Sequence, residues 1–88
     1  MNDRDPNLVI SSHSGKMTQD GVTVEVSIFR LEHEKDWTLE VVNDAGTSIV
    51  WDAVFRSDDA AMDEFRRTVA DEGMKTFLDH SNVVPFRR

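Results

Sequence analysis

The sequence predicts an α+β domain in which a three-stranded antiparallel meander (β-β-β-α) carries one main C-terminal helix packed on one sheet face. Three stretches of alternating apolar and polar residues predict the strands, and they span Gly21–Glu32, Trp37–Asn43 and Thr47–Phe55. A capped amphipathic segment, Asp58–Glu72, predicts the helix. Because one helix covers one face of such a sheet, the pattern also predicts a second face without a helix.

The first predicted strand has the most regular alternation. β-Branched residues occupy every second position from Val22 to Ile28, which is typical of a strand with one buried face. After Ile28 the phase reverses, because Phe29 and Leu31 are apolar while their neighbours are polar. Either a bulge shifts the register at Phe29, or this end of the strand carries an apolar residue on each face.

Two short connections set the register of the predicted sheet. The segment Asn43–Gly46 predicts a type I turn followed by Gly46 in the left-handed region, a three-residue loop that pairs Asn43 with Thr47. Residues 33–36 form a polar connection of hairpin length. The connections predict four further pairs: Val41 with Ile49, Leu39 with Trp51, Trp37 with Ala53, and Ile28 with Val41. One face then collects the expected core side chains of the sheet: Val24, Val26, Ile28, Trp37, Leu39, Val41, Ile49, Trp51 and Phe55.

The predicted helix has both a start signal and a stop signal. Ser57 is a good N-cap, and Asp58 and Asp59 follow in the first turn, where the helix dipole favours negative charge. Gly73 fits the left-handed position just after a helix end, and Met74 can make the accompanying apolar contact. The apolar stripe of the helix recurs at spacings of three and four: Ala61, Met62, Phe65 and Val69.

The segments outside this pattern are mostly polar. Residues 1–20 are expected to be a flexible N-terminal segment, residues 21–79 a single α+β domain, and residues 80–88 a flexible C-terminal tail. The apolar island Leu8–Ile10 can form an edge strand. Residues 75–79 fit either a short helical turn or a fourth strand, and the helical turn is the preferred interpretation.

The predicted face without the helix is more apolar than a solvated sheet face. In the predicted register it collects five apolar residues: Phe29, Leu31, Val42, Val50 and Val54. An exposed cluster of this kind indicates an interface. The candidate covers are the N-terminal apolar island, the segment Val83–Phe86 and the same face of a second copy. We prefer a homodimer, because a packed core of about 60 residues is marginal and the chain has no cysteine for a disulfide.

The charge of the chain limits its partners. The formal net charge is −7, and between Glu32 and Glu64 ten acidic residues are opposed only by Lys35 and Arg56. A field of this sign repels phosphate backbones, so we expect no direct nucleic-acid binding. Such a surface keeps a protein soluble, and it also fits a basic protein partner.

Nothing in the sequence indicates a membrane segment. No apolar run approaches the roughly 18 residues that a spanning helix needs. The first residues lack the basic and apolar regions of a signal peptide. We therefore expect a cytoplasmic protein without membrane association.

The residues with catalytic or ligand-binding potential do not form a recognisable motif. The histidines sit in three separate polar segments and lack the spacing of a metal site. Three acids gather at the helix start, where capping and the helix dipole explain them. The two tryptophans are expected in the core. We therefore expect no enzyme, no cofactor and no metal site. The residues considered are His13, His33, His80, Asp52, Asp58, Asp59, Asp63, Trp37 and Trp51.

One segment resembles a known family. The run Trp51–Ala61, about an eighth of the chain, is similar to the HicB-type antitoxin domain, in which a strand leads into a capped helix rich in acids and alanine. The remainder has no characteristic motif of that domain, so we assign the chain to no family. The resemblance implies that this chain is an antitoxin-like partner that neutralises a basic toxin or nuclease.

Together these patterns predict a non-catalytic protein-interaction or regulatory module that forms a homodimer. Two alternatives stay open. One is an antitoxin-like partner of a basic protein. The other is a small-ligand-binding domain with a pocket between Trp37, Trp51 and the helix.

Overall fold

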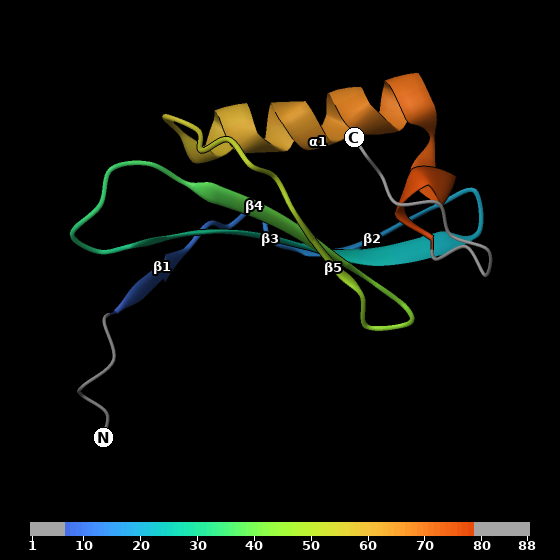
Figure 1. Cartoon of the computed structure of the whole chain (residues 1–88), viewed down its shortest axis with the longest axis horizontal. Helices are drawn as coiled ribbons and strands as arrows, with labels where there is room; N and C mark the ends of the chain where they lie inside the picture. The colour runs from blue at the N-terminus through green and yellow to red at the C-terminus, as the bar shows by residue number, and fades with distance from the viewer. Residues whose placement is uncertain (1–6, 79–88) are drawn as a thin grey trace.

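Residues 7–78 are described by a computed structural model, in which one long helix lies across an antiparallel sheet (Figure 1). The helix α1 (Asp58–Glu72) leads into a short 3-10 helix, η1 (Met74–Phe77). The predicted α+β fold is therefore confirmed, but the expected number of strands is wrong, because the sheet has five strands and not three. The strands are β1 (Leu8–Ile10), β2 (Gly15–Gln19), β3 (Val22–Leu31), β4 (Thr38–Asn43) and β5 (Ser48–Val50).

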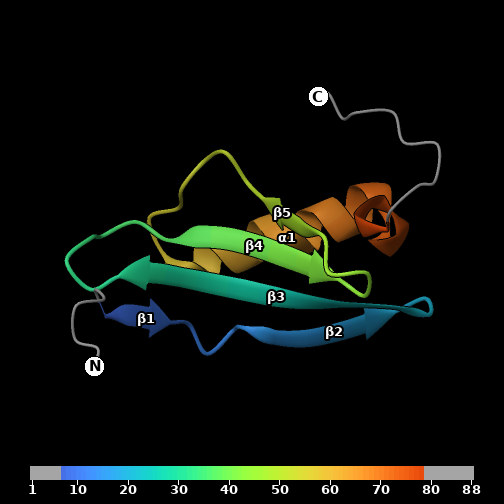
Figure 2. The same ribbon diagram turned by 60° about the horizontal axis from the view of Figure 1, so that its bottom comes forward.

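The two additional strands form one edge of the sheet. The strand order is β1-β3-β4-β5, and β2 also pairs with β3, so that β1 and β2 lie along different halves of β3 (Figure 2). Residues 8–19, expected within a flexible segment, make these strands. The signal for β2 is the turn after it, because Asp20 and Gly21 have φ angles of 55° and 78°, as a two-residue hairpin loop requires.

A turn of four residues, 11–14, separates β1 from β2, and we call it the serine turn. The ladder steps from the pair Ile10–Phe29 to the pair Gly15–Val26, so these four residues face only two residues of β3. Ser14 Oγ accepts the N–H of Ile28 at 3.0 Å and lies 3.3 Å from its carbonyl oxygen, to which it donates. The N–H of Ser11 also donates to this carbonyl oxygen at 2.9 Å, so the serine turn satisfies both backbone groups of Ile28 where the ladder is interrupted.

The hairpin between β4 and β5 has the predicted register. Val41 pairs with Ile49, and the N–H of Asn43 donates to the carbonyl oxygen of Thr47 at 3.0 Å. Gly46 has a φ of 89°, which is the left-handed conformation that the loop needs. Local turn chemistry and side-chain pattern therefore agree in this hairpin.

The register between β3 and β4 differs from the prediction by two residues. Ile28 pairs with Leu39 instead of Val41, so every side chain keeps its predicted face. The longer connection is held by Arg30, whose Nη1 donates to the carbonyl oxygens of Leu31, Glu32 and Glu34 at 3.2, 3.3 and 2.9 Å. The ladder with β4 runs through Phe29 without a bulge, so this end of β3 has an apolar residue on each face.

The predicted pair of Trp37 with Ala53 is wrong. Trp37 pairs with Phe55, and residues 52–54 bulge outward between Val50 and this bridge. Phe55 is half-buried and packs against the core, whereas Ala53 is exposed. The bulge buries the larger apolar side chain, which removes more apolar surface from water.

The core lies between α1 and the centre of the sheet. Val24, Val26, Ile28, Leu39 and Val41 are buried as predicted. The other predicted sheet residues, Trp37, Ile49, Trp51 and Phe55, are partly buried and pack against this core. From the helical layer the buried side chains are Ala61, Met62, Phe65, Met74 and Phe77.

The ends of α1 also follow the sequence. Ser57 Oγ accepts the N–H of Ala60 at 3.0 Å, and Gly73 has a φ of 82° and donates to Val69. The preferred helical turn after α1 is present as η1. Its Phe77, which the sequence pattern did not single out, stacks on Phe65 with ring centroids 5.7 Å apart.

We expect Asn43→Ala to lower the free energy of unfolding by about 2–4 kcal/mol. Asn43 is buried, its Nδ2 donates to the carbonyl oxygen of Phe77 at 2.8 Å, and its Oδ1 accepts the N–H groups of Ala45 and Thr47 at 2.9 Å each. Urea unfolding measures the change. Asn43→Asp keeps the acceptors but has no donor for Phe77. Wild-type stability in both variants would contradict a structural role for this amide.

Candidate functional site

The face of the sheet opposite α1, which we call the free face, carries the candidate interface. Phe29 and Leu31 point there from β3, Val42 from β4 and Val50 from β5, because each alternates with residues that face α1. Val50 is 53% exposed, while the other three are half-buried. Val54 is 57% exposed, but it lies in the bulge after β5 and not on a strand.

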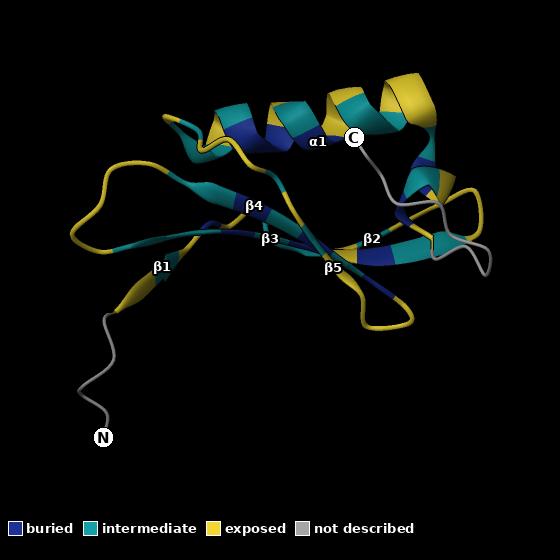
Figure 3. Ribbon diagram, viewed as in Figure 1, coloured by how far each residue is buried: buried dark blue, intermediate teal, exposed yellow. Residues whose placement is uncertain are grey.

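The strand β1 enlarges the free face. Leu8 pairs with Leu31 and Ile10 with Phe29, so both β1 side chains lie on that face beside their partners. Leu8 is 55% and Ile10 56% exposed, and Figure 3 shows β1 largely in the colour of exposed residues. The sequence contained the signal, since Leu8 and Ile10 alternate with Val9, but their partner strand could not be read from it.

The three expected covers of the free face have different outcomes. The segment Leu8–Ile10 lies within the sheet and extends the apolar surface instead of covering it. The segment Val83–Phe86 lies outside the described residues. A second copy of the face stays a prediction.

A polar cluster joins the serine turn to the start of α1. Ser11 Oγ donates to Asp58 Oδ2 at 2.8 Å, and His13 Nε2 lies 2.7 Å from Asp59 Oδ1. Ser11 is buried, and its Oγ also accepts the N–H of His13 at 3.0 Å. The proximity of these groups could not be predicted from the sequence, since His13 and Asp59 are 46 positions apart.

This cluster has the composition of a metal site, but its setting favours a structural role. Ligand atoms of His13, Asp58 and Asp59 lie within 4.8 Å of one another. They sit at the N-terminus of α1, where the helix dipole favours the carboxylates and opposes a cation. Asp63 is exposed and does not belong to the group. We therefore assign the cluster a structural role, in which its hydrogen bonds connect the serine turn to α1.

The two tryptophans have different surroundings. The guanidinium carbon of Arg30 lies 5.1 Å from the ring centroid of Trp37, within the range of a cation–π contact. Trp51 tilts toward Phe77, with ring centroids 6.3 Å apart, and its Nε1 donates to Glu64 at 3.2 Å. Both rings therefore stabilise the fold.

The carboxylate of Glu64 is held by two other side chains. It accepts hydrogen bonds from Arg67 and Trp51. The hydrogen bond from Arg67 lowers the pKa of Glu64, desolvation acts in the opposite direction, and the Trp51 bond lowers the pKa further. The same ion pair raises the pKa of Arg67.

Two grooves flank α1 because the helix is narrower than the sheet. The groove beside β2 has a volume of about 360 Å³ and is mainly apolar, with Met17, Phe65 and Val69 in its wall. The groove beside β5 has about 370 Å³ and is more polar, with Asp52 and Glu72 in its wall. Their residues come from segments far apart in the sequence.

No family model, no curated protein and no solved structure matches this chain. The resemblance of Trp51–Ala61 to the HicB-type antitoxin domain therefore stays a hypothesis. Within residues 7–78, no helix has both the length and the apolar character needed to cross a membrane. Function has to be argued from the surfaces.

We expect the effect of Glu64→Gln on stability to depend on pH. A carboxylate whose pKa is lower in the folded state stabilises the fold above its unfolded pKa, and this stabilisation is lost as the pH falls through the folded pKa. Glutamine keeps an acceptor for Trp51 but removes the charge. Urea unfolding should show the variant less stable near pH 7, by under about 1 kcal/mol, and this deficit should shrink as the pH falls below the usual pKa range of a glutamate. A deficit that stays constant as the pH falls would exclude this role of the charge.

Proposed function

We propose that the protein is a non-catalytic interaction module that forms a homodimer through the free face. The observation that supports this is the apolar group of Leu8, Ile10, Phe29 and Leu31, in which the two β1 side chains are more than half exposed. Apolar groups of this kind on a small domain are typical of protein–protein interfaces. The described helix lies on the opposite face and cannot shield them (Figure 1).

A second copy is the occupant that best fits this group. The apolar side chains lie on neighbouring strands, so two such faces can pack about 10 Å apart in a self-complementary contact. Full burial of one leucine or isoleucine side chain is worth about 1.5–3 kcal/mol, and each copy contributes several. The polar residues Thr38 and Glu40 of β4 share this face and lie between the apolar group and Val50 of β5.

A double substitution of exposed residues tests the dimer. We expect Ile10→Glu with Val50→Glu to yield a monomer, because four buried carboxylates would oppose association. Both residues are more than half exposed, so the core under α1 stays intact. Light scattering over a hundredfold dilution measures the mass, which for one chain is 10.0 kDa.

The matched control is Val54→Glu with Leu78→Glu. It changes the charge equally at exposed residues that lie on no strand, and it should keep the mass of the wild type. A wild type that is monomeric at every concentration would overturn the proposed dimer, and so would a test variant that stays dimeric.

A basic protein partner is the second candidate. The groove beside β5 carries the carboxylates of Asp52, Glu64 and Glu72 next to the ring of Trp51. A cationic side chain can meet both the acids and the aromatic face there. Purification of the native protein at low and high salt tests this. A basic protein that is retained only at low salt supports the proposal, and the absence of such a protein at both salt concentrations contradicts it.

A further inference from the structure

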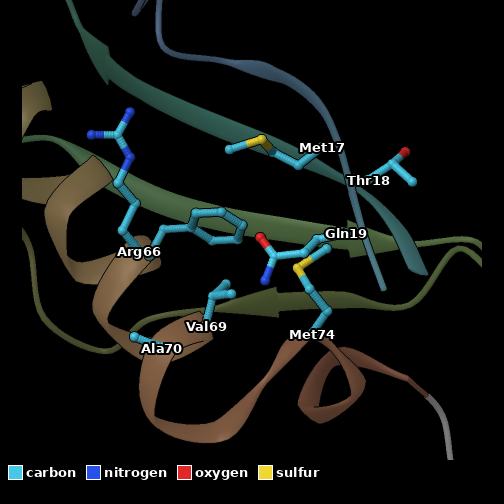
Figure 4. A pocket seen from close by; sticks show the side chains of 8 residues that line it. Met17, Thr18, Gln19, Arg66, Val69, Ala70 and Met74 are labelled. Carbon is cyan, nitrogen blue, oxygen red and sulfur yellow. The ribbon is translucent and has the colours of Figure 1, made fainter. Parts of the chain in front are cut away.

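The groove beside β2 combines an apolar wall with an open strand edge. Figure 4 shows Met17 and Gln19 of β2 facing the helical layer, with Val69 of α1 and Met74 of η1 around the same space. The groove arises because a helix is about 10 Å wide, and α1 contacts β3 and β4 in the middle of the sheet. The strand β2 is thus left beside the helix and not beneath it.

The hairpin geometry shows which backbone groups of β2 point outward. The two-residue loop Asp20–Gly21 makes Gln19 and Val22 a hydrogen-bonded pair, and such pairs alternate along an antiparallel ladder. Lys16 and Thr18 therefore direct their N–H and C=O groups away from β3. Among the described residues no strand pairs with that side of β2.

Among the residues that line this groove, Arg66 is the only one with a charged side chain, although the chain as a whole carries a net charge of −7. The exposed Arg66 lines the groove and makes no ion pair with another described residue. Lys16 is also exposed, but its side chain lies on the free face opposite Glu25 of β3, so Arg66 alone supplies the charge of the groove. A second copy of the groove would bring Arg66 against its own equivalent, and the chain's own end carries Arg87 and Arg88. The complementary occupant is therefore an anionic segment of another protein.

We propose that the outer edge of β2 and the groove beside α1 form a binding site for an extended, acidic segment of a partner protein, which adds to the sheet as an antiparallel strand. Backbone hydrogen bonds form to Lys16 and Thr18, two apolar side chains enter the groove, and a carboxylate meets Arg66. The site lies at the edge of the sheet and does not depend on dimerisation through the free face.

The orientation of α1 fixes the order of the partner's side chains. α1 begins beside Ser11, and Met74, which follows its end, lines the groove together with Gln19. The helix therefore runs in the direction of β2 and places Arg66 toward Gly15. Side chains of a strand that share a face lie two residues apart. An antiparallel segment therefore presents apolar residues opposite Gln19 and Met17, and its acid opposite Gly15. The intervening residues hydrogen-bond to Thr18 and Lys16.

The test uses the capped peptide Thr-Val-Thr-Val-Thr-Glu-Thr, which has this order, in a titration followed by protein amide NMR shifts. We expect the largest shifts at the amides of Lys16 and Thr18. Methylating the backbone nitrogens of the third and fifth residues should abolish binding, because these face β2. Methylating those of the two valines, which point away, should leave binding intact. The two methylated peptides have the same composition, so only the hydrogen-bonding pattern differs.

A charge exchange tests the groove. Arg66→Glu should weaken binding about fivefold, the effect of one exposed ion pair, and a peptide with lysine in place of its glutamate should recover the loss. Arg56→Glu changes the net charge equally in an exposed loop and should bind as the wild type does. The dimer variant Ile10→Glu with Val50→Glu should also bind the peptide, which separates this site from the free face. Absence of shifts at millimolar peptide, shifts centred on β5, or equal effects of the two methylation patterns would overturn the proposal.

Discussion

A single amphipathic helix of fifteen residues carries the main apolar contact of this sheet within the described part of the chain. Its buried residues Ala61, Met62 and Phe65 pack on β3 and β4, and Phe77 of η1 extends the layer by stacking on Phe65. Because one helix cannot span four strand positions, it leaves a groove at each side and an open face below. The surfaces on which both proposals rest are thus direct consequences of how little the helix covers.

Polar contacts decide where the helix sits on the sheet. At its start, Ser11 and His13 bond to Asp58 and Asp59, and beyond its end Asn43 bonds to the carbonyl oxygen of Phe77. Between them Glu64 holds the ring nitrogen of Trp51. Apolar packing alone tolerates sliding of a helix along a sheet, whereas these directional bonds connect it to three separate segments. The width of each groove is therefore set by hydrogen bonds as much as by packing.

The parts of the fold that the sequence could predict are those where two signals agree. The β4–β5 hairpin joins a turn residue, Gly46, with matching apolar alternation, and α1 joins an N-cap with an apolar stripe. The strand β2 has only Met17 as an apolar residue, so alternation could not reveal it, although the Asp20–Gly21 turn pointed to a hairpin. The β3–β4 register depends on Arg30, which donates to nearby loop carbonyl oxygens, and apolar alternation carries no signal for such side-chain contacts. For the candidate surfaces, Phe29 and Val50 were predictable from alternation, while the contribution of Leu8 and Ile10 required the pairing of β1.

The serine turn has a consequence for the solubility of the protein. A long, regular edge strand is a template on which further chains can stack into aggregates. Here the edge is divided into three residues of β1 and five of β2, and the turn between them is fastened to α1 and cannot straighten without breaking the bonds of Ser11 and His13. A short segment of the kind proposed above needs only β2, whereas a strand pairing with the whole edge would require the serine turn to straighten. The interruption thus lets the protein keep an accessible edge at a low risk of fibril growth.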